Sequence, residues 1–199
     1  MKARQYSVGF LMAGLAALAM SFDASAQDRK KAKPDASQGA SVSQVIGADT
    51  TITIDYHRPG LKGRDVWKES STNPAIGKLV PFDENPLPWR AGANEATTIE
   101  VSADVLVEGQ PLPAGKYALF MIPTESGEWS IVFNKTAKQW GAFRYDKTQD
   151  ALRVKVKVAE APAAEWLVFG FDNPADFSVT AYLHWEKVMV PFKIETAKK

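Results

Sequence analysis

Residues 152–158 read LRVKVKV, a run in which apolar and charged side chains alternate without a fault. Residues 50–57 (TTITIDYH) and 177–186 (FSVTAYLHWE) repeat this alternation, with the larger apolar side chains on one parity. Successive side chains of a β-strand point to opposite faces, so a period of two predicts strands with one buried face and one face in water. These three stretches together predict an all-β domain.

Turn sequences separate the alternating stretches, and a helical period is missing between them. The turns are predicted at 47–49, 108–110, 113–115, 125–128 and 186–187. Two further runs, 117–122 and 166–171, are apolar on both parities, which predicts central strands that are covered on both faces. About nine strands at intervals of roughly 8–12 residues predict an antiparallel two-sheet β-sandwich, with a closed β-barrel as the alternative.

The first residues have the composition of a signal peptide. Lys2 and Arg4 precede an apolar run at 8–20, and the small residues Ala24-Ser25-Ala26 follow it. This order predicts a signal peptide over residues 1–26 with cleavage before Gln27. The run is shorter than the ~20 residues that a bilayer-spanning helix needs. We therefore expect a periplasmic or secreted protein that has no transmembrane segment after cleavage.

The rest of the chain is predicted to form one domain. Residues 27–39 are charged and lack a large apolar side chain, which predicts a flexible linker; its basic run at 29–33 is either solvated or in contact with anionic lipid. Residues 40–195 form the β domain and 196–199 a short tail. Without the predicted signal peptide the chain holds 22 basic and 22 acidic residues. A balanced charge of this kind disfavours nucleic acid as a partner.

One long segment interrupts the regular spacing of the predicted strands. Residues 59–94 contain five prolines and four glycines, which predicts a long Pro/Gly-rich loop with room for a short helix near 75–78. Long ordered loops within compact domains often carry function. The loop region 57–94 is therefore the predicted binding region, for a small anionic or carbohydrate-like ligand or for a protein partner.

Arginines beside a tryptophan are the strongest candidates for ligand contact in this region. Arg58 shares the parity of Ile52 and Ile54, so it should lie at the mouth of the core, where its guanidinium needs an acceptor. A loop that folds back would place further candidate residues around it: His57, Arg64, Trp89, Arg90 and Asn94. Bidentate hydrogen bonds and ring stacking would suit an anionic or sugar-like ligand. The alternative is that the arginines only pin the loop to its own carbonyls and carboxylates.

Several motifs give the chain a resemblance to a known family. They are 56–64 (YHRPGLKGR), 79–82 (LVPF), 89–98 (WRAGANEATT), 112–120 (LPAGKYALF), and Asn134-Lys135 with Trp140-Gly141. With these motifs in order, the chain resembles the family of domain of unknown function 2911 over nearly all of residues 40–194. The resemblance implies an exported bacterial protein without an assigned activity. This chain carries a longer insertion at 67–77, together with 85–88.

The residue types needed for catalysis are scarce, so no catalytic residue, metal site or cofactor is predicted. The chain has no cysteine, and its two histidines, His57 and His184, fall on outward parities of different strands. A Gly-x-Ser-x-Gly elbow is missing, and Gly60–Gly63 is too short for a phosphate-binding loop. This composition favours a non-catalytic envelope binding module over a hydrolase in which His57 and Asp55 act as a base pair. A purely structural module is the third possibility, and the oligomeric state is left open.

Overall fold

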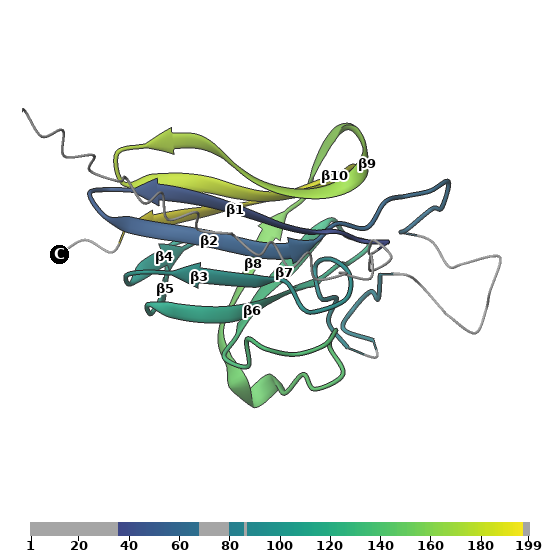
Figure 1. The fold of residues 1–199 in the computed structure, drawn as a ribbon, viewed down its shortest axis with the longest axis horizontal. Coiled ribbons are helices and arrows are strands. Elements are labelled where there is room, and N and C mark those ends of the chain that lie inside the picture. Colours follow the sequence, from purple (N-terminus) through teal and green to yellow (C-terminus); the bar gives the residue numbers. More distant parts are fainter. Residues whose placement is uncertain (1–35, 68–79, 86, 197–199) are drawn as a thin grey trace, which may run out of the picture. The chain divides into compact units, whose positions relative to one another are not determined.

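Ten strands form two antiparallel sheets in the computed structural model, which describes residues 36–67, 80–85 and 87–196 (Figure 1). The first sheet has the order β1 (Gly39–Ile46), β2 (Thr50–His57), β3 (Thr98–Val101), β6 (Gly115–Ile122), β7 (Glu128–Asn134) and β8 (Asp150–Lys157). The second has the order β5 (Gln110–Leu112), β4 (Val105–Val107), β10 (Ser178–Thr196) and β9 (Ala159–Ala175). Neither sheet closes into a barrel, so the predicted sandwich is confirmed and the barrel alternative is excluded.

Five of the predictions fall on parts of the chain that lie outside the described residues. They are the signal peptide at 1–26, most of the linker at 27–39, the short helix near 75–78, most of the insertion at 67–77 and most of the tail at 196–199. Within the described ranges, no helix has the length and apolar composition that crossing a bilayer requires.

The alternation read from the sequence corresponds to the two faces of each strand. In β2 every second residue is buried, and the same is true of β10 from Val179 to Trp185. These side chains meet those of the opposite sheet in one hydrophobic core. Phe177, predicted as the first inward residue of the last stretch, is instead 65% exposed because it lies in the turn before β10.

Two predictions about the strands are corrected by the sheet order. The run 117–122 in β6 is buried on both faces, as predicted, but the run 166–171 belongs to β9, an edge strand. Glu186 does not turn the chain either. It takes a positive φ of 54°, and the register shifts on both sides of it, so it forms a bulge inside a continuous β10. One strand can thereby pair with β9 along its first half and with β4 at its end.

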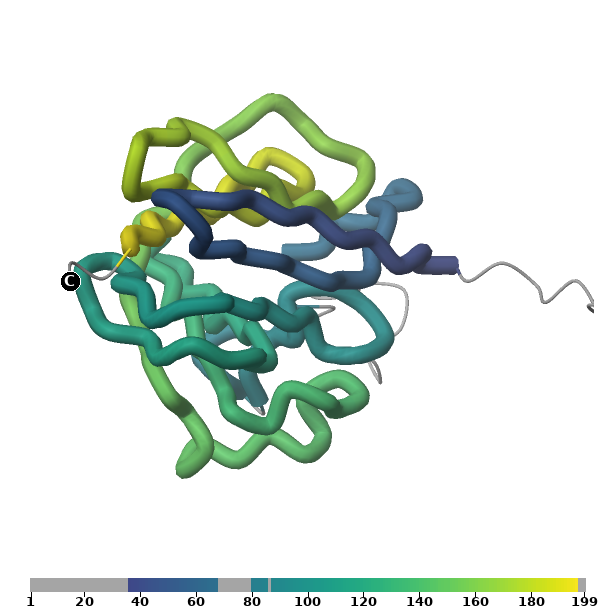
Figure 2. The backbone as a smooth tube through the Cα atoms, turned by 60° about the vertical axis from the view of Figure 1, so that its left-hand side comes forward, coloured from purple at the N-terminus to yellow at the C-terminus, as the bar shows by residue number. Residues whose placement is uncertain are grey.

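A second, smaller hydrophobic cluster lies on the outer face of the six-stranded sheet. Phe120 and Val132 from β6 and β7 point outward there, and Ala142 and Tyr145 from the loop between β7 and β8 pack against them. The Phe120 and Tyr145 rings meet edge to face at 5.2 Å. Figure 2 shows this loop, in green, at the bottom of the view. The cover explains why β6 is apolar on both faces.

Candidate functional site

The segment that begins at Arg58 ties the two sheets together. The Arg58 N–H donates to the Gln38 carbonyl at 2.9 Å, and its Nε donates to the Leu167 carbonyl of β9 at 3.0 Å. Next to it, Leu167 N–H donates to the Pro59 carbonyl, and Leu61 N–H donates to the Glu165 carbonyl. Residues 59–61 thus extend the free edge of β9. Arg58 also borders a recess of about 330 Å³ beside Trp166.

Arg64 holds the turn of its own loop. Its Nε donates to the Leu61 carbonyl at 2.9 Å and its Nη2 to the Gly60 carbonyl at 2.7 Å. Gly60 lies under the Trp166 ring, where a Cβ atom would come within 3.0 Å of the ring, so the turn has little room for a side chain. The guanidinium of Arg64 is therefore committed to the backbone of this turn.

Trp89 and Arg90 also have internal partners. Trp89 is only 4% exposed, its ring is stacked on Trp185 at 6.1 Å, and its backbone pairs with Met121 of β6. Arg90 Nη1 donates to the Asn94 carbonyl at 2.7 Å, and burial lowers the pKa of this guanidinium. The face of Trp89 that was predicted to meet a ligand is covered by the core.

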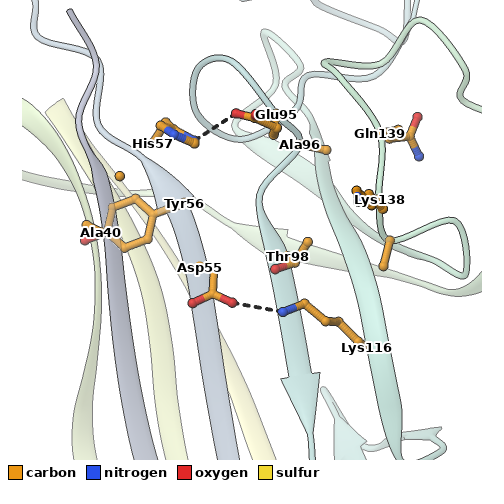
Figure 3. Close-up of a pocket in the computed structure, with 12 residues that line it drawn as sticks. Ala40, Asp55, Tyr56, His57, Glu95, Ala96, Thr98, Lys116, Lys138 and Gln139 are labelled. Carbon is orange, nitrogen blue, oxygen red and sulfur yellow. Dashed lines mark hydrogen bonds and ion pairs between the residues drawn. The ribbon is translucent and has the colours of Figure 1, made fainter. Parts of the chain in front are cut away.

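A cavity of about 490 Å³ lies elsewhere, on the outer face of the six-stranded sheet (Figure 3). Its floor comes from β1, β2, β3 and β6, and two loops form its rim. It is lined by Gly39, Ala40, Asp55, Tyr56, His57, Glu95, Ala96, Thr98, Lys116, Ala137, Lys138 and Gln139. Of the six residues predicted to bind a ligand, His57 alone is in this lining, so those six do not converge on one pocket.

Asp55 and Lys116 form an ion pair across the cavity floor. Lys116 Nζ lies 3.0 Å from Asp55 Oδ2, and the Ser41 hydroxyl donates to Asp55 Oδ1 at 2.7 Å. Burial alone would raise the pKa of Asp55, but the hydrogen bonds from Ser41 and Lys116 outweigh it and lower the pKa. The hydrogen bond to Asp55 in turn raises the pKa of Lys116. Both groups stay ionised near neutral pH, which suits ligand binding better than general acid–base catalysis.

The histidine of the cavity is paired with a carboxylate that the sequence analysis missed. His57 Nδ1 lies 3.4 Å from Glu95 Oε2, whereas Asp55 is engaged with Ser41 and Lys116. The predicted base pair of His57 with Asp55 is therefore not formed. Glu95 follows Asn94 in a motif already singled out, and only the folding of that segment beside the end of β2 reveals its role.

Gly92 is what allows this segment to approach β2 so closely. A Cβ atom on Gly92 would lie 3.0 Å from the His57 carbonyl oxygen and 3.0 Å from Thr97 Oγ1. Neither atom can retreat easily, because one is backbone and the other donates to the Ala91 carbonyl. Gly92 therefore permits the close approach that brings this segment, which carries Glu95, beside His57.

A second polar cluster lies on the outer face of β8. Arg153 binds both carboxylate oxygens of Glu84, at 2.8 and 3.1 Å, and donates from Nε to Asp150 at 2.6 Å. The Tyr145 hydroxyl donates to the same Asp150 at 2.8 Å, and burial followed by the bond to Asp150 raises the pKa of Tyr145 well above its usual range. This network holds the segment around Glu84 against the sheet. It is closed on itself, so we interpret it as structural.

Comparison with known proteins gives a family and no activity. Among the described residues, no group of three or more histidines and carboxylates is placed to hold a metal ion. No curated protein and no solved structure matches the chain. One family model matches residues 37–194, which is most of the chain and agrees with the resemblance drawn from the motifs. The chain therefore belongs to the family described as "Protein of unknown function (DUF2911)".

Proposed function

We propose that this chain is an exported, non-catalytic module that binds a small carbohydrate-like ligand in the cavity over β2, β3 and β6. The observation that supports it best is the cavity itself. Its volume of about 490 Å³ falls within the range of about 300–1,000 Å³ typical of small-molecule sites. Polar side chains converge on it, and Asp55, Lys116 and Glu95 are each roughly half exposed there, so a ligand can reach them.

The balance of charges around the cavity favours a sugar over an anion. Two carboxylates (Asp55 and Glu95) oppose two ammonium groups (Lys116 and Lys138), and Glu100 contacts Lys116 from outside the lining at 3.6 Å. Such a site gives a negatively charged ligand no net attraction. A polyhydroxylated ligand suits it, because each hydroxyl can donate to a carboxylate and accept from an ammonium group. The anionic ligand is retained as the alternative.

Replacing Lys116 with methionine tests this proposal. We expect the wild-type protein to bind one or more neutral methyl glycosides or disaccharides, and K116M to lose at least about tenfold in affinity, because a charged hydrogen bond contributes about 1.5–3 kcal/mol when it is made. Stability should change by no more than about 1 kcal/mol, since the Asp55–Lys116 pair is half exposed. Titration by two-dimensional NMR would report both the affinity and the residues that contact the ligand.

Lys155→Met is the matched control. Lys155 makes a similar exposed pair with Glu128 at 2.9 Å, on a strand that does not line the cavity. The Lys155→Met variant should bind the ligand with the same affinity as the wild type. If the protein binds phosphate or a uronate but shows no response to neutral sugars, the ligand is an anion rather than a neutral carbohydrate. If none of these ligands shifts the NMR signals of the residues that line the cavity, the result would contradict the proposal and favour a purely structural module.

The exported state has its own test, because it rests on Lys2, Arg4, the apolar run and Ala24-Ser25-Ala26. Expression of the full chain in a Gram-negative host, followed by osmotic release of the periplasm, should yield a protein whose intact mass equals that of a chain beginning at Gln27. Substituting Ala24 and Ala26 with bulky residues should block this processing. Recovery of the unprocessed wild-type chain from the cytoplasm would contradict export.

A further inference from the structure

The loop between β7 and β8 displays two aromatic side chains that the fold does not use. Trp140 is 56% exposed and Phe143 is 75% exposed. Their neighbours Ala142 and Tyr145 face inward, where they pack against the outer cluster around Phe120. The loop is thus anchored through one set of side chains and presents another to solvent. Clusters of exposed apolar side chains of this kind often mark interaction sites.

The backbone of this loop is held in place, so the two aromatics project from a fixed support. Trp140 forms an isolated bridge with Glu95, and Gly141 N–H donates to the Asn94 carbonyl at 3.0 Å. Tyr145 N–H donates to the Ala142 carbonyl, which closes the turn that carries Phe143. A rigid support lowers the entropic cost of inserting side chains into a partner.

Three basic residues are close to the two aromatics in the sequence of this loop, which also carries the exposed Asp146. Lys135, Lys138 and Arg144 are exposed, and none of them has an ion-pair partner within the part of the chain that the structure describes. Elsewhere in the same part, Lys116, Lys155 and Lys193 each lie within 4 Å of a carboxylate, whereas Lys62, Lys157 and Lys187 are exposed without such a pair and are scattered over other elements. The loop therefore combines unneutralised cations with exposed indole and phenyl rings on a protein of nearly balanced charge.

We propose that this loop docks on the surface of an anionic lipid bilayer, with Trp140 and Phe143 entering the interfacial region and Lys135, Lys138 and Arg144 meeting the headgroups. Aromatic rings settle at the level of the headgroups, and basic side chains gain energy from the negative surface potential. A bilayer demands the correct sign of charge and some insertable apolar surface, without a shaped groove. The loop offers these two properties. Lys138 also lines the cavity, so the variants tested below replace loop residues that lie outside that lining.

Sedimentation with lipid vesicles tests the proposal on the chain from Gln27 onward, which retains the compact unit Pro34–Lys199. We expect binding to vesicles that contain a third phosphatidylglycerol and little binding to pure phosphatidylcholine. The double variant Trp140→Ala/Phe143→Ala should lower the partition coefficient about tenfold or more. Lys135→Glu/Arg144→Glu should also lower it at least about tenfold, and added salt should weaken wild-type binding.

Matched substitutions outside the loop distinguish docking through this loop from nonspecific adsorption to vesicles. Phe177→Ala removes a 65% exposed ring and Lys187→Glu reverses an exposed cation, both on other elements, and each should bind as the wild type does. A further variant neutralises the basic run at 29–33, the other part of the chain that could contact anionic lipid. The proposal is overturned if that variant alone abolishes binding, if the loop variants bind normally, or if no vesicle is bound.

Discussion

Replacing Trp89 with alanine should lower the free energy of unfolding by about 3–5 kcal/mol, the range for deleting a large aromatic side chain from a packed core. Trp89 is buried against two other tryptophans: its ring is stacked on Trp185 at an interplanar angle of 15° and meets Trp67 nearly perpendicular at 6.1 Å. The same Trp67 touches Trp129, so the deletion would open a cavity within a connected aromatic cluster. Urea unfolding followed by circular dichroism would measure the loss.

Trp140→Ala is the control for this prediction, since it makes the same substitution at a position that is 56% exposed. Its effect on the free energy of unfolding should stay within about 0.5 kcal/mol. A loss below about 1 kcal/mol for Trp89→Ala would mean that the ring is not packed as the structure has it. The hypothesis that Trp89 offers a face to a ligand would then regain its basis.

The fold class could be predicted from the sequence because its signal is local. In β2 and β8 the alternation of side chains is visible within eight residues, and it depends only on the geometry of an extended chain. Edge and central positions are not local in this way. The run 166–171 is apolar on both parities, yet β9 is an edge strand whose outer edge pairs with residues 59–61 from a distant part of the chain, and Trp166 is 43% exposed.

The partners of the charged residues could not be predicted for a similar reason. Asp55 and His57 share a face of β2, but residues two apart on a strand lie about 6.6 Å from each other, whereas directly opposite residues on neighbouring strands lie about 4.5–5.5 Å apart. Asp55 is opposite Ser41 on one side and Thr98 on the other, and it bonds Ser41 and Lys116. The order of the strands in the sheet therefore decides which charged residues pair in the cavity. The sequence of a single strand does not reveal which strands lie beside it.

The long loop shows how composition can mislead about exposure. Proline and glycine predicted a long loop in which Trp89 could meet a ligand, yet that residue pairs with Met121 through two backbone hydrogen bonds and lies in the core. The parity of Arg58 was informative, since the residue does lie where β2 leaves the core. Its acceptor, the carbonyl of Leu167, is 109 residues away in the chain, so no local pattern contains it.

Arg153→Met should produce the second large effect, a loss of about 2–3 kcal/mol at neutral pH. Arg153 lies between Glu84 and Asp150, and its removal would leave Asp150 without a cation and Glu84 with only the more distant Lys147, at 3.7 Å. Breaking a fully buried pair in this way costs about 3–5 kcal/mol. We expect less here because the side chains of Arg153 and Glu84 are 27% and 26% exposed, so water partly screens them. Lys155→Met, which breaks the more exposed pair with Glu128, should cost no more than about 1 kcal/mol.

Acidification should remove much of the difference between Arg153→Met and the wild type. The hydrogen bonds from Arg153 and then its charge lower the pKa of Glu84 from its ordinary value of 4.5, against the opposing effect of burial. A carboxyl whose pKa is lowered on folding contributes stability that is present above its unfolded-state pKa and lost as the pH falls through its folded-state pKa. The wild type should therefore lose this contribution below about pH 4.5, whereas Arg153→Met retains only the smaller part that comes from the charge of Lys147. Urea midpoints measured between about pH 7 and pH 3 should converge; a constant gap would assign the effect to the packing of the arginine side chain rather than to its charge.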